Sequence, residues 1–142
     1  SDRNLTSLCL EGTNLLMVEF PREPFKDWMT YELENLAYTL PVKLMIAHID
    51  RYYHWYKPEE MDAILQLPAI FQINAEAFEE KHTQKIVLSL AEQGYPLVLG
   101  SDAHNETGRA PNFDLIEKKV KKSKLQDFYQ AVAQTIHDLA LD

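Results

Sequence analysis

The chain has 142 residues, of which 46% are hydrophobic and 25% charged, and its formal net charge is −8. This length and composition fit a single globular domain, whereas the negative charge argues against a nucleic-acid-binding surface, which needs a basic face. The single cysteine, Cys9, cannot form an intrachain disulfide and fits a reducing compartment, so we expect a cytoplasmic protein. No apolar run approaches the roughly 20 residues of a membrane span. The basic run at residues 118–124 fits a solvated surface or a docking site for an acidic partner.

Four short apolar runs predict four strands. They lie at residues 14–20 (NLLMVEF), 42–47 (VKLMIA), 69–74 (AIFQIN) and 96–100 (PLVLG). Longer helical patterns separate them. Strands that alternate with helices indicate right-handed βαβ units, so the sequence predicts an α/β fold with about four parallel strands.

The helices have recognisable ends. Asp27 is expected to cap a helix that reaches about residue 40, before Pro41, and Pro58 to begin a short helix. A longer helix after the third strand should end at Gly94, and a weaker pattern covers residues 114–122. The residues expected to face the core are Leu33, Leu36, Ala37 and Leu40 in the first helix, Phe78, Ile86, Val87 and Leu90 in the longer one, and Leu125, Phe128, Val132, Ile136 and Leu139 in the last.

A polar side chain stands at the C-terminal end of every predicted strand. These residues are Glu19, His48, Asn74 and the pair Asp102 and His104. Parallel sheets place their ligand sites at that edge, so the two carboxylates and two imidazoles should converge there. Nitrogen and oxygen donors without cysteine favour manganese, iron or zinc over calcium. The pattern predicts a divalent-metal site, although each residue alone could cap a loop.

Two arginines follow the predicted ligands closely. Arg51 comes three residues after His48, and Arg109 five residues after His104. A guanidinium beside a metal site suits a phosphate-like oxyanion, because its planar fork donates two hydrogen bonds at once. Ion pairs with a neighbouring carboxylate are the alternative. The chain has no G-x-S-x-G elbow, and no arginine stands six residues after Cys9, so hydrolysis would rely on water activated by a metal.

Four aromatic residues follow the first arginine within five positions. Two interpretations stay open for this group: a wall for a ring-bearing substrate, or a cover over the mouth of the fold. Three histidines lack a strand-end context and are predicted to lie on the surface or to have their hydrogen bonds satisfied within helices. The aromatic residues are Tyr52, Tyr53, Trp55 and Tyr56, and the surface histidines are His54, His82 and His137.

The segments LLMVEFP, IAHIDRY, FQINAEAF and LGSDAHNETGR resemble successive motifs of the PHP superfamily, from about Leu8 to the C-terminus. They are most similar to its manganese-dependent protein-tyrosine phosphatases from capsular and exopolysaccharide gene clusters of Gram-positive bacteria. The resemblance implies a distorted, TIM-like (β/α)7 barrel with three metal ions. It also implies that the substrate is a phosphotyrosine protein, a tyrosine autokinase that controls polysaccharide synthesis.

The resemblance also assigns roles to individual residues. Glu19 matches a metal-bridging glutamate, and His48, Asp102 and His104 match metal ligands. The arginines Arg51 and Arg109 match phosphate-binding residues. Ile49 and Asp50 stand where Pro-Glu is frequent in relatives, which is a mild departure.

The larger departure is that the His-x-His motif opening the family's first strand is absent. Residues 1–142 are therefore expected to form a partial PHP domain, either a fragment of a longer protein or a half that associates with itself as a homo-oligomer. Alone, the chain should be nearly inactive, because it carries too few ligands for three ions. The alternatives are another PHP phosphoesterase, similar to histidinol-phosphate phosphatase, and a non-catalytic remnant that only binds a partner.

Overall fold

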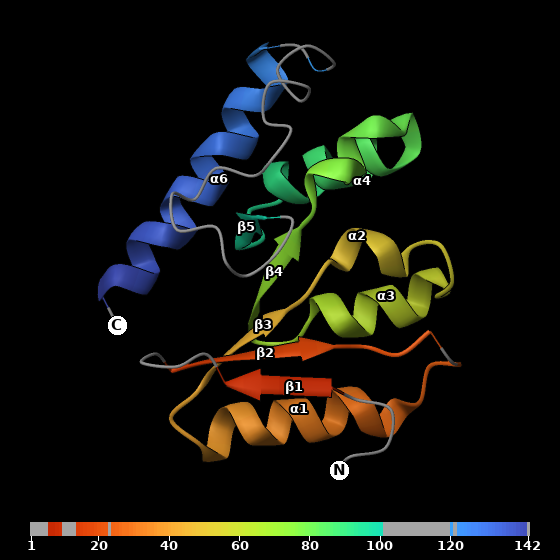
Figure 1. The fold of residues 1–142 in the computed structure, drawn as a ribbon, viewed down its shortest axis with the longest axis vertical. Coiled ribbons are helices and arrows are strands. Elements are labelled where there is room, and N and C mark those ends of the chain that lie inside the picture. The colour runs from red at the N-terminus through yellow and green to blue at the C-terminus, as the bar shows by residue number, and fades with distance from the viewer. Residues whose placement is uncertain (1–5, 10–13, 23, 101–119, 121, 142) are drawn as a thin grey trace. The chain divides into compact units, whose positions relative to one another are not determined.

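The structure is a computed structural model that describes residues 6–9, 14–22, 24–100, 120 and 122–141. Parallel strands alternate with helices in a mixed α/β fold, which confirms the predicted fold class (Figure 1). The chain divides into two compact units, Ser1–Ile70 and Phe71–Asp142. Strand β4 (Ala69–Ile73) runs across this division.

The first unit is built on three paired strands. The strand β2 (Leu15–Glu19) pairs in parallel with β3 (Lys43–Ile46), with Leu15 opposite Lys43 and Val18 opposite Ile46. On its other side β2 pairs with an antiparallel strand, β1 (Thr6–Cys9). The sequence did not predict β1, because four residues without a marked alternation give little strand signal. With β1 present, β2 is paired on both sides.

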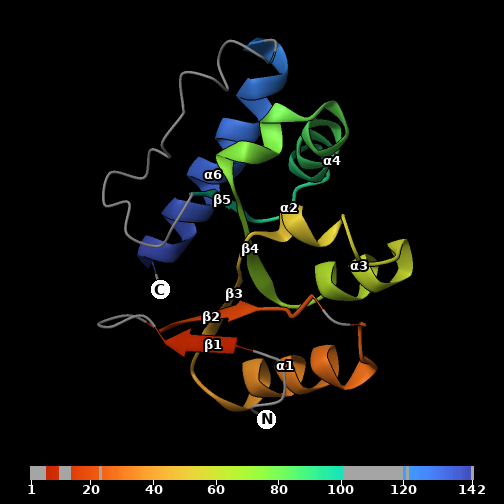
Figure 2. The same ribbon diagram turned by 45° about the vertical axis from the view of Figure 1, so that its right-hand side comes forward.

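Helices lie on both sides of the β2–β3 pair. In both ribbon views α1 (Asp27–Thr39) lies on one side, and α3 (Pro58–Leu65) lies on the other (Figures 1 and 2). Between β3 and α3 the chain forms one short helix, α2 (Ile49–Tyr52). Side chains from each layer are fully buried or nearly so and form the core of this unit: Val18, Met29, Leu33, Leu44, Ile46, Ile49, Met61 and Ile64.

The ends of the predicted helices need two corrections. The N-cap of α1 is Lys26, and Asp27 is the first helical residue, where its carboxylate suits the positive end of the helix without a side-chain cap bond. Leu40 was expected in the core but is 48% exposed, because α1 ends at Thr39 and Leu40 already has an extended backbone. Pro58 begins α3 as predicted, and the Glu60 carboxylate accepts the N–H of Lys57 at 2.7 Å.

The second unit contains the parallel pair of β4 and β5 (Leu97–Leu99), with Phe71 opposite Leu97. A 3₁₀-helix, η1 (Ala75–Glu79), follows β4 and leads into α4 (Lys81–Glu92); the predicted long helix is thus two elements. The last helix, α6 (Lys122–Leu141), contacts α4 and β5. The ring of Phe78 in η1 packs edge-on against Phe128 in α6, with 5.1 Å between centroids.

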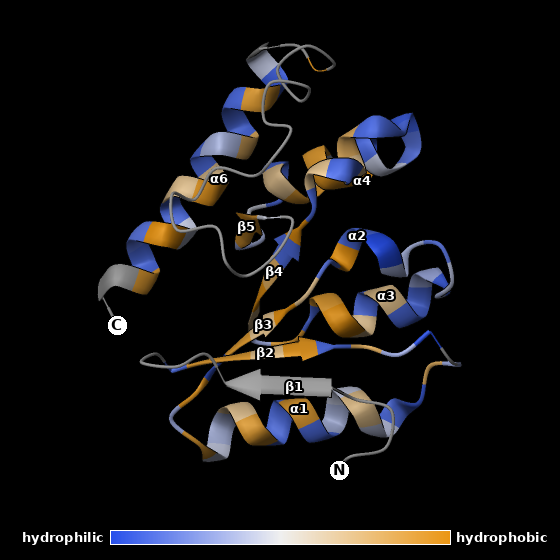
Figure 3. Cartoon of the chain, in the orientation of Figure 1, coloured by the Kyte–Doolittle hydropathy of each residue, from blue (hydrophilic) through white to orange (hydrophobic). Residues whose placement is uncertain are grey.

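Two features of the second unit bear on the predicted helix patterns. Gly94 ends α4 as expected, with φ of +85°. The N–H groups of Gly94 and Tyr95 then donate to the carbonyls of Ala91 and Leu90, which is a Schellman motif. Ile136 was expected to be buried but is exposed, because the buried face of α6 contains Thr135 in its place. Figure 3 shows the resulting alternation of hydrophobic and hydrophilic segments along α6.

Candidate metal centre

Two predicted site residues leave neighbouring parallel strands at the same edge. Strand β2 ends at Glu19, and His48 follows β3 by two residues. The Ala47 N–H donates to the Val18 carbonyl at 2.8 Å, so the pairing continues up to the point where both chains leave the sheet. Parallel strands place their carboxyl ends together, and here that geometry brings Glu19 and His48 into contact.

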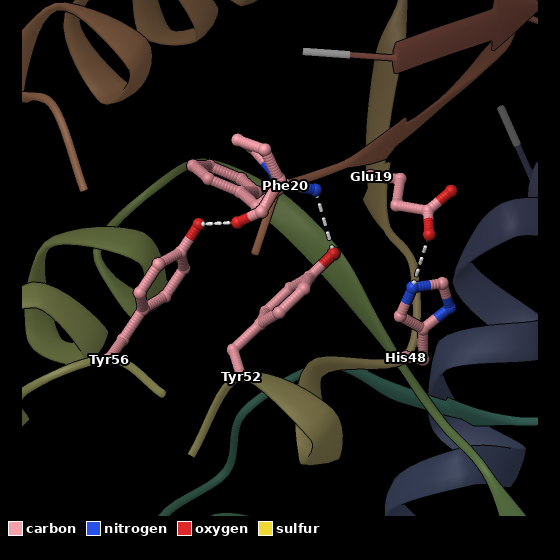
Figure 4. A network of polar contacts seen from close by, with 6 residues as sticks. Glu19, Phe20, His48, Tyr52 and Tyr56 are labelled. Atoms are coloured by element: carbon pink, nitrogen blue, oxygen red, sulfur yellow. Dashed lines mark hydrogen bonds and ion pairs between the residues drawn. The ribbon is translucent and has the colours of Figure 1, made fainter. Parts of the chain in front are cut away.

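The two side chains meet directly. The distance from Nε2 of His48 to Oε1 of Glu19 is 3.0 Å (Figure 4). A carboxylate only accepts hydrogen bonds, so Nε2 donates in the metal-free state. Burial lowers the pKa of His48, and this effect outweighs the opposing influence of the Glu19 carboxylate. The imidazole is therefore neutral at pH 7, which is the form that binds metals.

His48 has an unusual backbone conformation. Its φ of 35° and ψ of 57° place it in the left-handed region, and no other described non-glycine residue has a positive φ. This conformation turns the chain from β3 into α2. A non-glycine residue there costs about 1–2 kcal/mol, which glycine would avoid. Such a cost persists where the side chain has a use, so the strain supports a functional role for this imidazole.

The pair fits part of a divalent-metal site. Adjacent ligands at about 2.1 Å from one ion and at right angles lie about 3.0 Å apart, which matches the observed separation. Within the described part of the chain, however, no group of three or more His, Cys, Asp or Glu side chains could hold a metal ion. The other predicted ligands, Asp102 and His104, lie outside the described residues, as does Arg109.

The remaining predicted site residues lie in both units. Arg51 is exposed in α2, and its backbone N–H donates to the carbonyl of His48 at 3.0 Å, so one tight turn links the arginine to the candidate ligand. Asn74, at the end of β4, is buried and occupies the N-cap position of η1 in the second unit. The three histidines predicted at the surface are all exposed, as expected: His54, His82 and His137.

The aromatic group that follows Arg51 lies largely inside the first unit. Tyr52 is completely buried and Tyr56 nearly so, which rules out the interpretation of these two rings as a substrate wall. Their hydroxyl groups bind the chain that leaves β2: the Tyr52 oxygen accepts the N–H of Phe20 at 2.8 Å, and Tyr56 donates to the carbonyl of Pro21 (Figure 4). Neither bond was predicted from the sequence, because the partners lie 32 and 35 residues apart along the chain.

The burial of Tyr56 predicts a loss of stability at high pH. Burial raises the pKa of Tyr56 to about 12, whereas an unfolded tyrosine ionises at about pH 10. The unfolded chain therefore loses its proton first. The stabilisation is fully present below about pH 10 and disappears as the pH rises through the pKa of Tyr56 in the folded protein. Urea titrations between neutral and high pH should show a steeper alkaline loss for the parent than for Tyr56→Phe. Equal slopes would contradict this account.

Comparison with known proteins identifies the chain. The family described as capsular polysaccharide synthesis, CpsB/CapC, matches residues 3–137. The chain belongs to this family. Its membership confirms the resemblance noted in the sequence.

The fold also resembles a solved structure. A chain from the crystal structures of YwqE from Bacillus subtilis and CpsB from Streptococcus pneumoniae, described as unique metal-dependent tyrosine phosphatases, matches with a TM-score of 0.59 and 21% identity. The match covers 87% of this chain and 53% of the other, so the chain spans about half the length of that relative. No curated protein matches the sequence. Among the described residues, no helix combines the length and apolar character that crossing a membrane would require.

Proposed function

We propose that this chain forms part of a metal-dependent phosphotyrosine-protein phosphatase that acts in capsular or exopolysaccharide synthesis. The observation that carries the proposal is the contact of 3.0 Å between Glu19 and His48 at one edge of parallel strands. Membership of the CpsB/CapC family supports the biological setting. The description of the structural relative as a metal-dependent tyrosine phosphatase supports both the metal and the substrate class.

Two kinds of side chain have different roles in the proposed site: some bind metal and others bind phosphate. Glu19 and His48, together with Asp102 and His104, hold divalent metal, for which Mn²⁺ suits the mixed oxygen and nitrogen donors. A bound divalent cation supplies Lewis-acid polarisation of a phosphoryl oxygen and makes water more acidic. The guanidinium groups of Arg51 and Arg109 bind the non-bridging phosphate oxygens, which gain charge in the transition state.

The proposal extends to the protein's partner and setting. The substrate is a tyrosine autokinase in the cytoplasm, and its dephosphorylation regulates polysaccharide synthesis. Residues 1–142 form a partial PHP domain, in line with a match that covers 53% of the structural relative. The four predicted ligands are too few to saturate three ions. We therefore expect the chain of 142 residues to be nearly inactive by itself.

Chelation tests this proposal in the product of the complete reading frame. Hydrolysis of a phosphotyrosyl peptide should disappear with EDTA and return when excess Mn²⁺ is added, because the ligands act only through the metal. Assays with histidinol phosphate, under the same conditions, distinguish the other PHP phosphoesterase, and we expect turnover of the peptide to be much faster. Activity that persists after chelation would contradict the metal assignment. A metal-loaded protein without turnover of either substrate would support the non-catalytic remnant.

A further inference from the structure

The end of β2 is attached to the α2 segment at two adjacent positions. The Glu19 carboxylate contacts the imidazole of His48, and the N–H of Phe20 donates to the hydroxyl oxygen of Tyr52. His48 is the N-cap residue of α2 and Tyr52 is the last residue of this helix. Their ring centroids lie 5.7 Å apart, so the two side chains are neighbours. Figure 4 shows the two contacts side by side.

The contact with Tyr52 replaces a sheet hydrogen bond. Strand β2 ends at Glu19, and Phe20 is buried, so its N–H needs a partner that is not water. The hydroxyl of the fully buried Tyr52 supplies that partner at 2.8 Å. The Phe20 ring also packs edge-on against the ring of Tyr52, with 5.7 Å between centroids. The position of Phe20 is thus set by both the backbone and the side chain.

A fixed Phe20 amide constrains Glu19. The peptide unit that joins these residues is planar, so the N–H of Phe20 and the Cα of Glu19 move as one rigid group. The Glu19 side chain is half exposed, and among the described residues its carboxylate contacts the imidazole of His48 at 3.0 Å. The position of the Glu19 backbone is therefore set largely by the hydrogen bond of the Phe20 N–H and by the pairing of β2.

We propose that Tyr52 is a positioning residue that holds the Glu19 carboxylate beside His48 in the arrangement needed to bind one metal ion. This inference rests on the proposed metal-dependent function. The role belongs to the hydroxyl group of this buried tyrosine and not to its ring. Tyr52 would thus set the geometry of the metal ligands without being a ligand itself.

The test is Tyr52→Phe in the product of the complete reading frame. This variant keeps the ring and removes the acceptor for the Phe20 N–H. Mn²⁺ affinity, measured by titration with EPR detection of free Mn²⁺, should fall by about 10–100-fold, as is typical when the support of a metal ligand is lost. In the metal-free protein, the NMR shifts of the His48 imidazole should also change, because its contact with Glu19 is displaced.

A matched control separates positioning from stability. Thr83 is buried in the second unit, and its hydroxyl donates to the Ala77 carbonyl at 2.5 Å. Thr83→Val also removes a buried hydrogen bond, but it should leave the Mn²⁺ affinity and the His48 shifts unchanged. Parental affinity and unchanged His48 shifts in Tyr52→Phe would overturn the positioning role, and so would equal losses of affinity in both variants. Glu19→Gln distinguishes failure of the positioning role from failure of the proposed metal site. Unchanged Mn²⁺ affinity in Glu19→Gln would overturn the metal site itself.

Discussion

Replacing His48 by alanine should weaken Mn²⁺ binding and phosphotyrosine hydrolysis by more than about 100-fold, since removing even the support of a metal ligand costs about 10–100-fold. The imidazole nitrogen is one of the two donors in the Glu19–His48 pair, and it is neutral at pH 7 because burial lowers the pKa of His48. Calorimetric titration with Mn²⁺ and a steady-state assay on the product of the complete reading frame measure the two losses.

The left-handed backbone at residue 48 provides a control for this variant. Alanine at a φ of 35° retains the steric cost of a Cβ atom, whereas glycine avoids it. His48→Gly should therefore be more stable than His48→Ala by about 1 kcal/mol, although both lose the imidazole. If the two variants lose metal affinity equally while His48→Gly is the more stable, the loss of function comes from the missing ligand. Recovery of metal binding in the glycine variant would show that His48 acts through the backbone alone.

Replacing Arg51 by alanine should lower the rate of phosphotyrosine hydrolysis by about 10²–10³-fold, which corresponds to about 2–4 kcal/mol of transition-state stabilisation. The guanidinium stands three residues after His48 and is exposed in α2, so its removal leaves no cavity. We expect the melting temperature to change little. Arg51→Lys should recover only part of the rate, because an ammonium group cannot donate the paired hydrogen bonds of a guanidinium.

Arg22 offers a matched control for Arg51. It is an exposed arginine in the same unit, and its guanidinium lies 5.5 Å from the centroid of the Trp55 ring in a cation–π arrangement. Arg22→Ala should retain most of the parental turnover. If Arg51→Ala turned over substrate at the parental rate, or if both variants lost the same modest amount, Arg51 would be an ordinary surface charge.

The sequence predicted the elements that have strong local signals. Apolar runs followed by a polar residue located β2 and β3, and their parallel pairing placed Glu19 beside His48. Gly94 marked the end of α4 because its positive φ favours glycine. These features depend on short stretches of chain, for which residue type and spacing carry most of the information.

The parts that were missed depend on contacts between distant residues. The left-handed backbone of His48 has only a weak signal in the residue type, since most histidines have a negative φ even though histidine adopts a positive φ more often than most non-glycine residues. Tyr52 is fixed by an amide 32 residues earlier in the chain, and its burial depends on packing that periodicity does not reveal. The roles of Asp102, His104 and Arg109 remain predictions.

The most direct test of the central claim is a crystal structure of the product of the complete reading frame, grown with Mn²⁺ and measured at the manganese absorption edge. We predict an anomalous peak within about 2.0–2.3 Å of both Oε1 of Glu19 and Nε2 of His48, in place of the hydrogen bond between them. A protein that hydrolyses phosphotyrosine while its manganese lies elsewhere, with the contact of 3.0 Å between Glu19 and His48 intact, would contradict the account.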